Sequence, residues 1–199
     1  MSQTQEKEIF RVMTIANSTI KTTEKKAKAK PKPKANAKVL TVEDSGNVLG
    51  GRSKRKLQGV NPEMENVVEL ALKYSLVDFG VNEGVRSMAR QRQLMREGKT
   101  KTFHSKHLDG SAVDLLAYVD GKYTYEPWNL YVTIAEAMFK AAKELDVKIM
   151  WGACWLDETS KFETAEKALA EYKKVRKSQG RKPFLDAVHF ELWDGRTHY

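Results

Sequence analysis

The 199-residue sequence predicts one α+β domain, a small, mainly antiparallel sheet with helices packed on one side, preceded by a basic extension. Three observations lead to this prediction. Hydrophobic residues make up 41% of the chain, which is enough for one core. Short apolar runs alternate with longer segments whose apolar residues recur at helical spacing. Residues 1–58 carry fourteen Lys or Arg against five Asp or Glu, whereas residues 59–199 carry twenty-one of each.

The extension, residues 1–56, is predicted to be largely disordered. Within it, residues 21–38 combine repeated lysines with two prolines, so like charges repel and no core can form. The part that follows is polar, contains glycines and ends in a basic cluster. We expect ordered structure to begin near Leu57, so that residues 57–199 form the folded domain.

The first half of this domain carries clear helix signals. Asn61 suits a helix N-cap and Pro62 suits the first helical position, and the apolar residues that follow share one face. A short strand is expected over residues 79–85. A second helix is expected over residues 87–97, capped by its serine and ended by Gly98.

The second half begins with a loop over residues 99–110. Asp120-Gly121 is a hairpin-turn signal after the next strand. The further elements alternate in type, and we expect a strand over 111–119, a long helix opening at Pro127, a strand over 147–151, a charged helix over 161–178 and a last strand over 187–193.

Composition excludes several classes of protein. The net charge of +9 comes from the extension and the domain is formally neutral, which argues against a basic groove for nucleic acid in the domain itself. A single cysteine, Cys154, excludes an intrachain disulfide. The sequence contains no run of eighteen apolar residues, so we expect no transmembrane helix. The N-terminus lacks the basic and apolar regions of a secretory signal, so we expect synthesis in the cytoplasm without a signal peptide.

Two short segments carry residue types that bind metals. Ser105-x-His107-x-x-Gly-x-Ala-x-Asp114 places an imidazole in a loop and a carboxylate in the strand after it, and Asp186-x-x-His189 adds a second pair near the last strand. A catalytic zinc ion usually takes three protein ligands and leaves a fourth position for water. His107, Asp114 and His189 offer three ligands, and Asp186 remains as a base.

These segments resemble the zinc D,D- and L,D-peptidases of the bacterial cell wall, most closely the phage L-alanyl-D-glutamate endolysins. Asn61-Pro-Glu-Met-Glu, Glu83-Gly-Val-Arg86-Ser, the two metal segments and Trp151-Gly-Ala-Cys-Trp155 occur in that family's order. The likeness covers roughly residues 57–195. It implies a zinc D-Ala-D-Ala peptidase/hedgehog-like fold and one Zn²⁺ per chain.

The resemblance also implies roles for the site residues. Asp186 would act as general base on a water molecule and pass the proton to the departing amine. Arg86 would bind the oxygen of the scissile carbonyl or a substrate carboxylate. Ser105 would help to bind substrate. Each residue also has an ordinary interpretation: a loop Asp at the start of a strand, a surface Arg and a turn residue.

Four further features stay open. Trp151 and Trp155 could line the cleft or pack in the core. Cys154 stands where relatives carry Asp, and we expect it to be a small buried hydrophobic residue. His104 falls outside the pattern and is expected in a loop. Residues 157–183 look like an insertion that either lines the cleft or extends into solvent.

The function expected from these residues is hydrolysis of the L-Ala–D-Glu bond of the peptidoglycan peptide stem, with bacterial lysis as the biological role. One alternative is a D-Ala-D-Ala carboxypeptidase or dipeptidase on the same scaffold. A second is a non-catalytic, zinc-containing module that binds the cell wall, although such a module has no need of Asp186. A third is nucleic-acid binding by the basic arm, which lacks aromatic residues for base stacking.

The expected partners follow from the same interpretation. The peptide stem is the substrate, and residues 1–56 could attract anionic envelope polymers without specificity. We expect a monomer that reaches the wall through a separate membrane-permeabilising partner.

Overall fold

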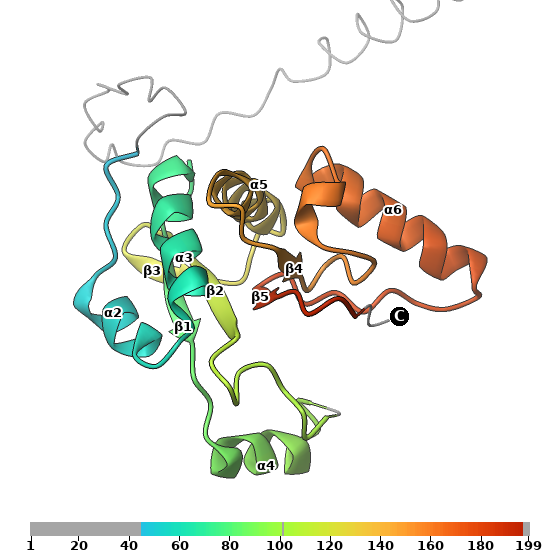
Figure 1. Cartoon of the computed structure of the whole chain (residues 1–199), viewed down its shortest axis with the longest axis horizontal. Helices are drawn as coiled ribbons and strands as arrows, with labels where there is room; N and C mark the ends of the chain where they lie inside the picture. Colours follow the sequence, from blue (N-terminus) through green and yellow to red (C-terminus); the bar gives the residue numbers. More distant parts are fainter. Residues whose placement is uncertain (1–44, 101, 197–199) are drawn as a thin grey trace, which may run out of the picture. The chain divides into compact units, whose positions relative to one another are not determined.

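The computed structural model describes residues 45–100 and 102–196 (Figure 1), and the predicted disordered segment 21–38 lies outside them. Helices and antiparallel strands alternate, which confirms the predicted α+β class. The elements are α2 Gly51–Leu57, α3 Pro62–Tyr74, β1 Phe79–Glu83, α4 Met88–Arg96, β2 Ala112–Val119, β3 Lys122–Thr124, α5 Asn129–Glu144, β4 Ile149–Trp151, the short 3₁₀ helix η1 Thr159–Lys161, α6 Ala165–Ser178 and β5 His189–Leu192.

The sheet has the strand order β1-β2-β5-β4, and β3 pairs with β2 as the second arm of a hairpin. Every pairing is antiparallel. In the register, Asp114 of β2 lies opposite His189 of β5 on one side and Glu83 of β1 on the other. Three polar residues from three strands are therefore brought side by side near one end of the sheet.

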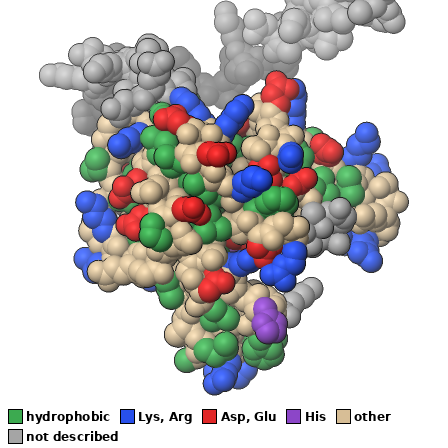
Figure 2. Space-filling view, in the orientation of Figure 1, with side chains coloured by type: hydrophobic (Ala, Val, Ile, Leu, Met, Phe, Trp, Pro, Cys, Tyr) green, Lys and Arg blue, Asp and Glu red, His purple; other side chains and the backbone are tan. Residues whose placement is uncertain are grey.

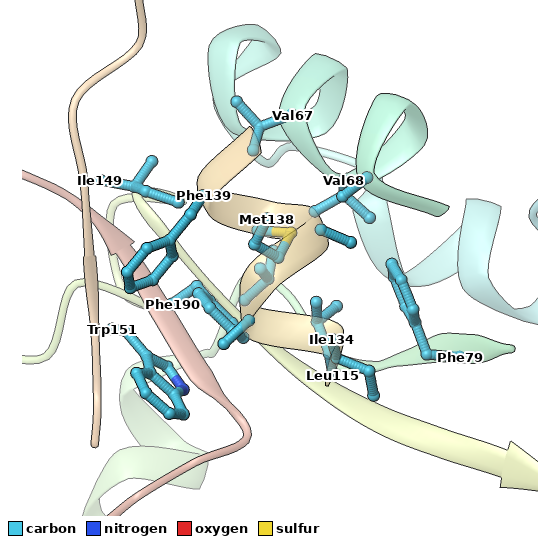
Figure 3. Close-up of a cluster of buried hydrophobic side chains, with 14 of the residues drawn as sticks. Val67, Val68, Phe79, Leu115, Ile134, Met138, Phe139, Ile149, Trp151 and Phe190 are labelled. Atoms are coloured by element: carbon cyan, nitrogen blue, oxygen red, sulfur yellow. The ribbon is translucent and has the colours of Figure 1, made fainter. Parts of the chain in front are cut away.

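The hydrophobic core lies between the sheet and the pair of helices α3 and α5. Apolar side chains of both helices meet residues of the strands in one cluster (Figure 3). Its fully buried members include Val67, Val68, Ile134, Met138, Leu115, Ile149, Trp151 and Phe190. The helix α4 lies at the far end of the molecule from α3 and α5 (Figure 1).

The predicted caps are present. The side chain of Asn61 accepts a hydrogen bond from the N–H of Glu63 at 2.9 Å, and Pro62 is the first residue of α3. The hydroxyl of Ser87 accepts from the N–H of Arg90 at 3.2 Å and starts α4. Gly98 follows α4 with φ +68°, a conformation that favours glycine.

The structure differs from the sequence prediction at the start of the domain. Order does not begin at Leu57, because α2 already spans residues 51–57 and Leu49 is buried. The hydroxyl of Ser53 accepts a hydrogen bond from the N–H of Val81 at 3.0 Å, which attaches α2 to β1. This segment has no apolar periodicity, since a single serine and a single leucine make its buried face. Tertiary contacts hold it, so a sequence pattern could not reveal it.

Acidic and basic side chains are interspersed over the visible face of the domain (Figure 2). In the described part of the chain, no helix is long and apolar enough to cross a membrane.

Candidate active site with a metal centre

The predicted metal-binding residues lie on neighbouring strands and on the loop before β2. Asp114 and His189 are directly opposite each other in the register. His107 lies in the loop that leads into β2 through Gly110. Gly110 has φ +77°, and a Cβ there would lie 2.5 Å from the backbone oxygen of Gly59. The chain therefore bends sharply at Gly110, and the close approach of the Gly59 backbone requires a residue without a side chain.

Three side chains each place one ligand atom at a common point. His107 Nε2 lies 3.2 Å from both Asp114 Oδ1 and His189 Nδ1, and His189 Nδ1 lies 3.1 Å from Asp114 Oδ1. These three residues form a group that could hold a metal ion. A tetrahedral zinc ion with bonds of about 2.0–2.1 Å holds neighbouring ligand atoms about 3.3 Å apart. The triangle therefore fits three of the four positions around such an ion.

Each imidazole is oriented by a hydrogen bond on its other nitrogen. His107 Nδ1 lies 2.8 Å from the carbonyl oxygen of Gly84, and His189 Nε2 lies 3.0 Å from Glu191 Oε2. Because both partners accept hydrogen bonds, the outward nitrogens carry the protons. The inward nitrogens then present lone pairs, which is how metal-ligating histidines are held.

The charges around this group favour a cation at its centre. Burial alone would lower the pKa of His189, but hydrogen bonds with Asp114 and Glu191 raise that pKa to about 10. Burial alone would raise the pKa of Asp114, but hydrogen bonds with His107 and His189 hold it well below its usual range. A divalent cation supplies the same positive charge while leaving both imidazoles neutral.

Asp186 reaches the same region from the segment before β5. Its backbone N–H donates to the carbonyl oxygen of Gly152 at 2.9 Å, and its own carbonyl accepts from the N–H of His189 at 3.1 Å. Burial raises the pKa of the Asp186 carboxyl, and the negative charge of Asp114 adds to this rise. A carboxylate with a raised pKa accepts a proton more readily, as a general base must.

Arg86 follows β1 and is held beside the metal-binding group. Its Nη2 forms an ion pair with Glu83 at 2.5 Å and lies 3.7 Å from Asp114 Oδ2. Its Nη1 donates to Gln91 Oε1 at 2.9 Å and to Ser105 Oγ at 3.4 Å. Among the described residues, its buried Nε has no hydrogen-bond partner. The contacts of Nη1 and Nη2 fix the guanidinium in position next to Asp114.

The remaining candidate residues lie either beside the metal-binding group or in the hydrophobic core. Trp151 is fully buried, whereas Trp155 is half-buried and stacks on His189 with ring centroids 5.6 Å apart. Cys154 is buried in the core, as expected, and is not one of the grouped ligands. Ser105 is a turn residue, since its carbonyl accepts a hydrogen bond from the N–H of Leu108 at 2.9 Å, and its hydroxyl also accepts one from Arg86 Nη1 at 3.4 Å.

Two predicted features lie apart from the metal-binding group. His104 is exposed and is not one of its members. The insertion over residues 157–183 contains η1 and α6, and α6 contacts α5. A surface hollow of about 330 Å³ lies along this insertion. It shares no residue with the metal-binding group, so it is not part of the candidate active site. It is lined by Leu156, Asp157, Lys161, Phe162, Glu171 and Val175.

Sequence reasoning missed two buried polar residues that hold the site. Gln91 of α4 is fully buried, accepts from Arg86 and donates to the carbonyl of Thr102 at 2.6 Å. Its contact with Arg86 is tertiary, so no sequence pattern predicts it. Glu191 orients His189, and this pair had a signal: residues two apart on a strand share one face.

Comparisons with known proteins point to one class of enzyme. The model of a family described as phage L-alanyl-D-glutamate peptidase matches residues 46–193. The L-alanyl-D-glutamate peptidase of Escherichia phage T5 is 32% identical over 109 residues, which cover 53% of this chain and 80% of the phage protein. The crystal structure of the Serratia marcescens L-Ala D-Glu endopeptidase ChiX superimposes with a TM-score of 0.53 at 35% identity, over 77% of this chain and 96% of that chain.

Proposed function

The chain belongs to the phage L-alanyl-D-glutamate peptidase family, and we propose that it cuts the L-Ala–D-Glu bond of the peptidoglycan stem with one Zn²⁺ held by His107, Asp114 and His189. The bond is the one named in its relatives, so the chain is a peptidase of the cell wall. One observation supports zinc binding: three potential ligand atoms lie 3.1–3.2 Å apart, and each imidazole is oriented by a hydrogen bond on its other nitrogen.

Asp186 is the proposed general base. Zinc, when bound, polarises a carbonyl and lowers the pKa of water towards about 7. Asp186 takes the proton from the attacking water, whose oxygen forms the new bond to the carbonyl carbon. When the C–N bond breaks, Asp186 returns the proton to the departing amine. Its raised pKa, caused first by burial, suits both transfers.

Arg86 is the proposed electrostatic partner of the carbonyl oxygen. Negative charge develops on this oxygen as the water attacks, and a donor already fixed in place stabilises it without reorganisation. The hydrogen bonds from Arg86 to Gln91 and Ser105 supply that fixation. Ser105 is assigned to substrate binding through the same contact.

Metal content tests the first part of the proposal. Protein purified without added metal should contain one equivalent of zinc by elemental analysis. His107→Ala should lose both metal and activity, because two ligands cannot hold a catalytic ion tightly. Full activity after exhaustive chelation would remove zinc from the reaction.

Product analysis tests the bond. Purified muropeptides should yield fragments that begin at D-Glu when they are examined by mass spectrometry. Release of D-Ala would instead support the carboxypeptidase alternative, and binding without turnover would support the wall-binding module.

We further propose that the chain acts as a monomer made in the host cytoplasm and gains access to the wall through a separate membrane-permeabilising partner. Light scattering of the purified chain tests the monomer. Lysis of intact cells only after the inner membrane is permeabilised tests the route.

A further inference from the structure

An exposed apolar surface adjoins the candidate metal centre and has no role in the reaction described above. Trp155 stacks on His189, and Phe184 stacks on Trp155 with ring centroids 6.0 Å apart and an interplanar angle of 29°. Leu185 follows Phe184 and precedes Asp186. We call Trp155, Phe184 and Leu185 the aromatic surface.

The exposure of this surface is unusual for its composition. Phe184 is 61% exposed and Leu185 is 36% exposed. Single apolar residues on a protein surface are common and need no explanation. Here, however, two rings stack in series outward from a metal ligand. Contiguous apolar surface beside a polar site is the usual composition of a ligand-binding site.

The fold holds this surface in place. The backbone N–H of Phe184 donates to the hydroxyl of Tyr172 at 3.3 Å. Tyr172 is buried and belongs to α6, within the insertion over residues 157–183. The insertion therefore supports the segment that carries Phe184 next to the site, a role that the sequence had left open.

The two sides of the metal centre differ in chemistry. Arg86 follows β1 and Trp155 follows β4, and these strands form opposite edges of the β1-β2-β5-β4 sheet. Asp114 on β2 and His189 on β5 lie between them. An extended peptide that crosses the metal centre thus meets a guanidinium on one side and aromatic rings on the other.

The proposed substrate has the same asymmetry. After the scissile bond comes D-Glu, which carries a free carboxylate. Before it come the methyl group of L-Ala, a lactyl group and the ring of N-acetylmuramic acid. The ring-to-ring steps of 5.6 and 6.0 Å each correspond to about 1.6–1.8 residues of extended chain, and together to at most about 3.5, at about 3.3–3.6 Å per residue. The aromatic surface therefore has the reach to contact both L-Ala and the sugar.

We propose, on the basis of the function above, that the aromatic surface binds the N-acetylmuramyl-L-alanine side of the scissile bond. Trp155 packs against the alanine, and Phe184 packs against the lactyl group and the apolar face of the sugar. D-Glu then lies on the side of Arg86.

A comparison of two substrates tests this assignment. One is N-acetylmuramyl-L-Ala-γ-D-Glu-L-Lys, and the other is N-acetyl-L-Ala-γ-D-Glu-L-Lys, which lacks the sugar and lactyl group. Phe184→Ala should lower kcat/KM for the muramyl substrate by about 5- to 30-fold, mainly through KM, since it removes apolar contact area. The acetyl substrate should change by less than about twofold. An equal loss with both substrates, or no loss with either, overturns the proposal.

A matched control is available in Tyr125, which is 64% exposed, follows β3 and lies outside the site residues. Tyr125→Ala should change neither substrate. Phe184→Leu keeps apolar volume and should give a smaller loss that is again confined to the muramyl substrate. If Phe184→Ala does not fold, Phe184→Leu makes the same test, and equal losses with both substrates overturn the proposal.

Calorimetry with the two product halves separates this inference from the proposed function. Phe184→Ala should weaken binding of N-acetylmuramyl-L-alanine and leave binding of γ-D-Glu-L-Lys unchanged. The opposite pattern overturns the proposed orientation. Failure of the wild-type chain to cut either substrate before D-Glu contradicts the proposed function instead, and the binding experiment still tests the aromatic surface.

Discussion

At the scale of single residues, the positions of the hydrogen bonds distinguish a carboxylate that orients a metal ligand from one that can exchange a proton with water. Glu191 bonds the outward nitrogen of His189, and that bond holds the imidazole for a metal. The same bond occupies Glu191 on the side of the ring away from the three ligand atoms. Glu191 therefore orients His189, and we propose Asp186 as the carboxylate that exchanges protons with water.

Substitution of Asp186 should separate chemistry from metal binding. Asp186→Ala removes the carboxyl without touching a ligand, so the protein should keep one equivalent of metal and its melting temperature. Turnover should fall by about 10²–10⁴-fold, the usual contribution of a positioned acid or base. Elemental analysis and a muropeptide assay on the same sample make the measurement. A wild-type rate with metal retained would contradict this role for Asp186.

The thiol of Cys154 should be unreactive in the folded protein. Burial raises the pKa of this thiol from 9.0 to about 11. The thiol stays neutral in the fold, so its contribution to stability is complete below about pH 9 and is lost as the pH rises through about 11. At pH 8, alkylation by iodoacetamide should be at least about 100-fold slower than in urea, because the thiolate fraction is smaller by that factor. Rapid alkylation of the native chain would show that Cys154 is accessible.

The grouping of His107, Asp114 and His189 could be predicted because two short sequence motifs contain all three residues. His107 and Asp114 lie within one short segment, and Gly110 between them supplies the bend that joins loop to strand. The contacts of Gln91 could not be predicted, because they join α4 to Arg86 and to the loop at Thr102. Such contacts depend on the packed structure and leave no periodic pattern.

At the scale of elements, the junction of β4 and β5 sets the position of the proposed base. Gly152 donates to the carbonyl oxygen of His189 at 2.8 Å and accepts from the N–H of Asp186 at 2.9 Å. A Cβ on Gly152 would lie 2.3 Å from the backbone oxygen of Asp186 and 3.0 Å from His189 Cβ. The segment that carries Asp186 can lie this close only because residue 152 has no side chain.

Gly152→Ala should therefore destabilise the fold and the reaction together. The backbone around Asp186 must move, and overpacking of this kind costs about 1–3 kcal/mol. Thermal unfolding should show the loss of stability, and kcat should fall more than metal content does. Gly50→Ala is the matched control, because a Cβ at Gly50 meets nothing within 4 Å. A Gly152→Ala variant with the stability and kcat of the wild type would show that the junction tolerates a side chain.

Elements with strong local signals agree with the sequence prediction, and elements held by contacts do not. The helix α3 has its cap, its proline and a continuous apolar face. The strand β3 has three residues and exists as the return arm of the hairpin at Asp120-Gly121, whose φ angles are +50° and +79°. That turn was predicted, but three residues without apolar alternation do not indicate a strand. The helix α2 was not predicted for a related reason, because tertiary contacts hold it in place.

At the scale of the whole molecule, the excess of basic over acidic residues comes from two segments of the chain. Residues 1–44 carry ten Lys or Arg against five Asp or Glu. The other basic excess is the cluster Arg52, Lys54, Arg55 and Lys56, which belongs to α2 and so to the folded part. A test of the extension must therefore stop before Ser45, whose N–H donates to the carbonyl of Lys73 at 2.7 Å.

Removal of residues 1–44 should affect activity on walls and leave the chemistry intact. The proposed catalytic residues lie between Arg86 and His189, so the truncated chain should cut soluble muropeptides at the full rate. Its activity on whole walls at low salt should fall, because the deleted segment carries net positive charge that anionic wall polymers attract. The difference between the two forms should shrink as salt rises, since charges are screened beyond about 8 Å near physiological ionic strength. Turbidity clearing of purified walls across a salt series, beside the soluble assay, makes the comparison. Equal clearing by both forms at low salt would show that this segment does not anchor the enzyme, and a loss on soluble muropeptides would show that it contributes to the folded domain.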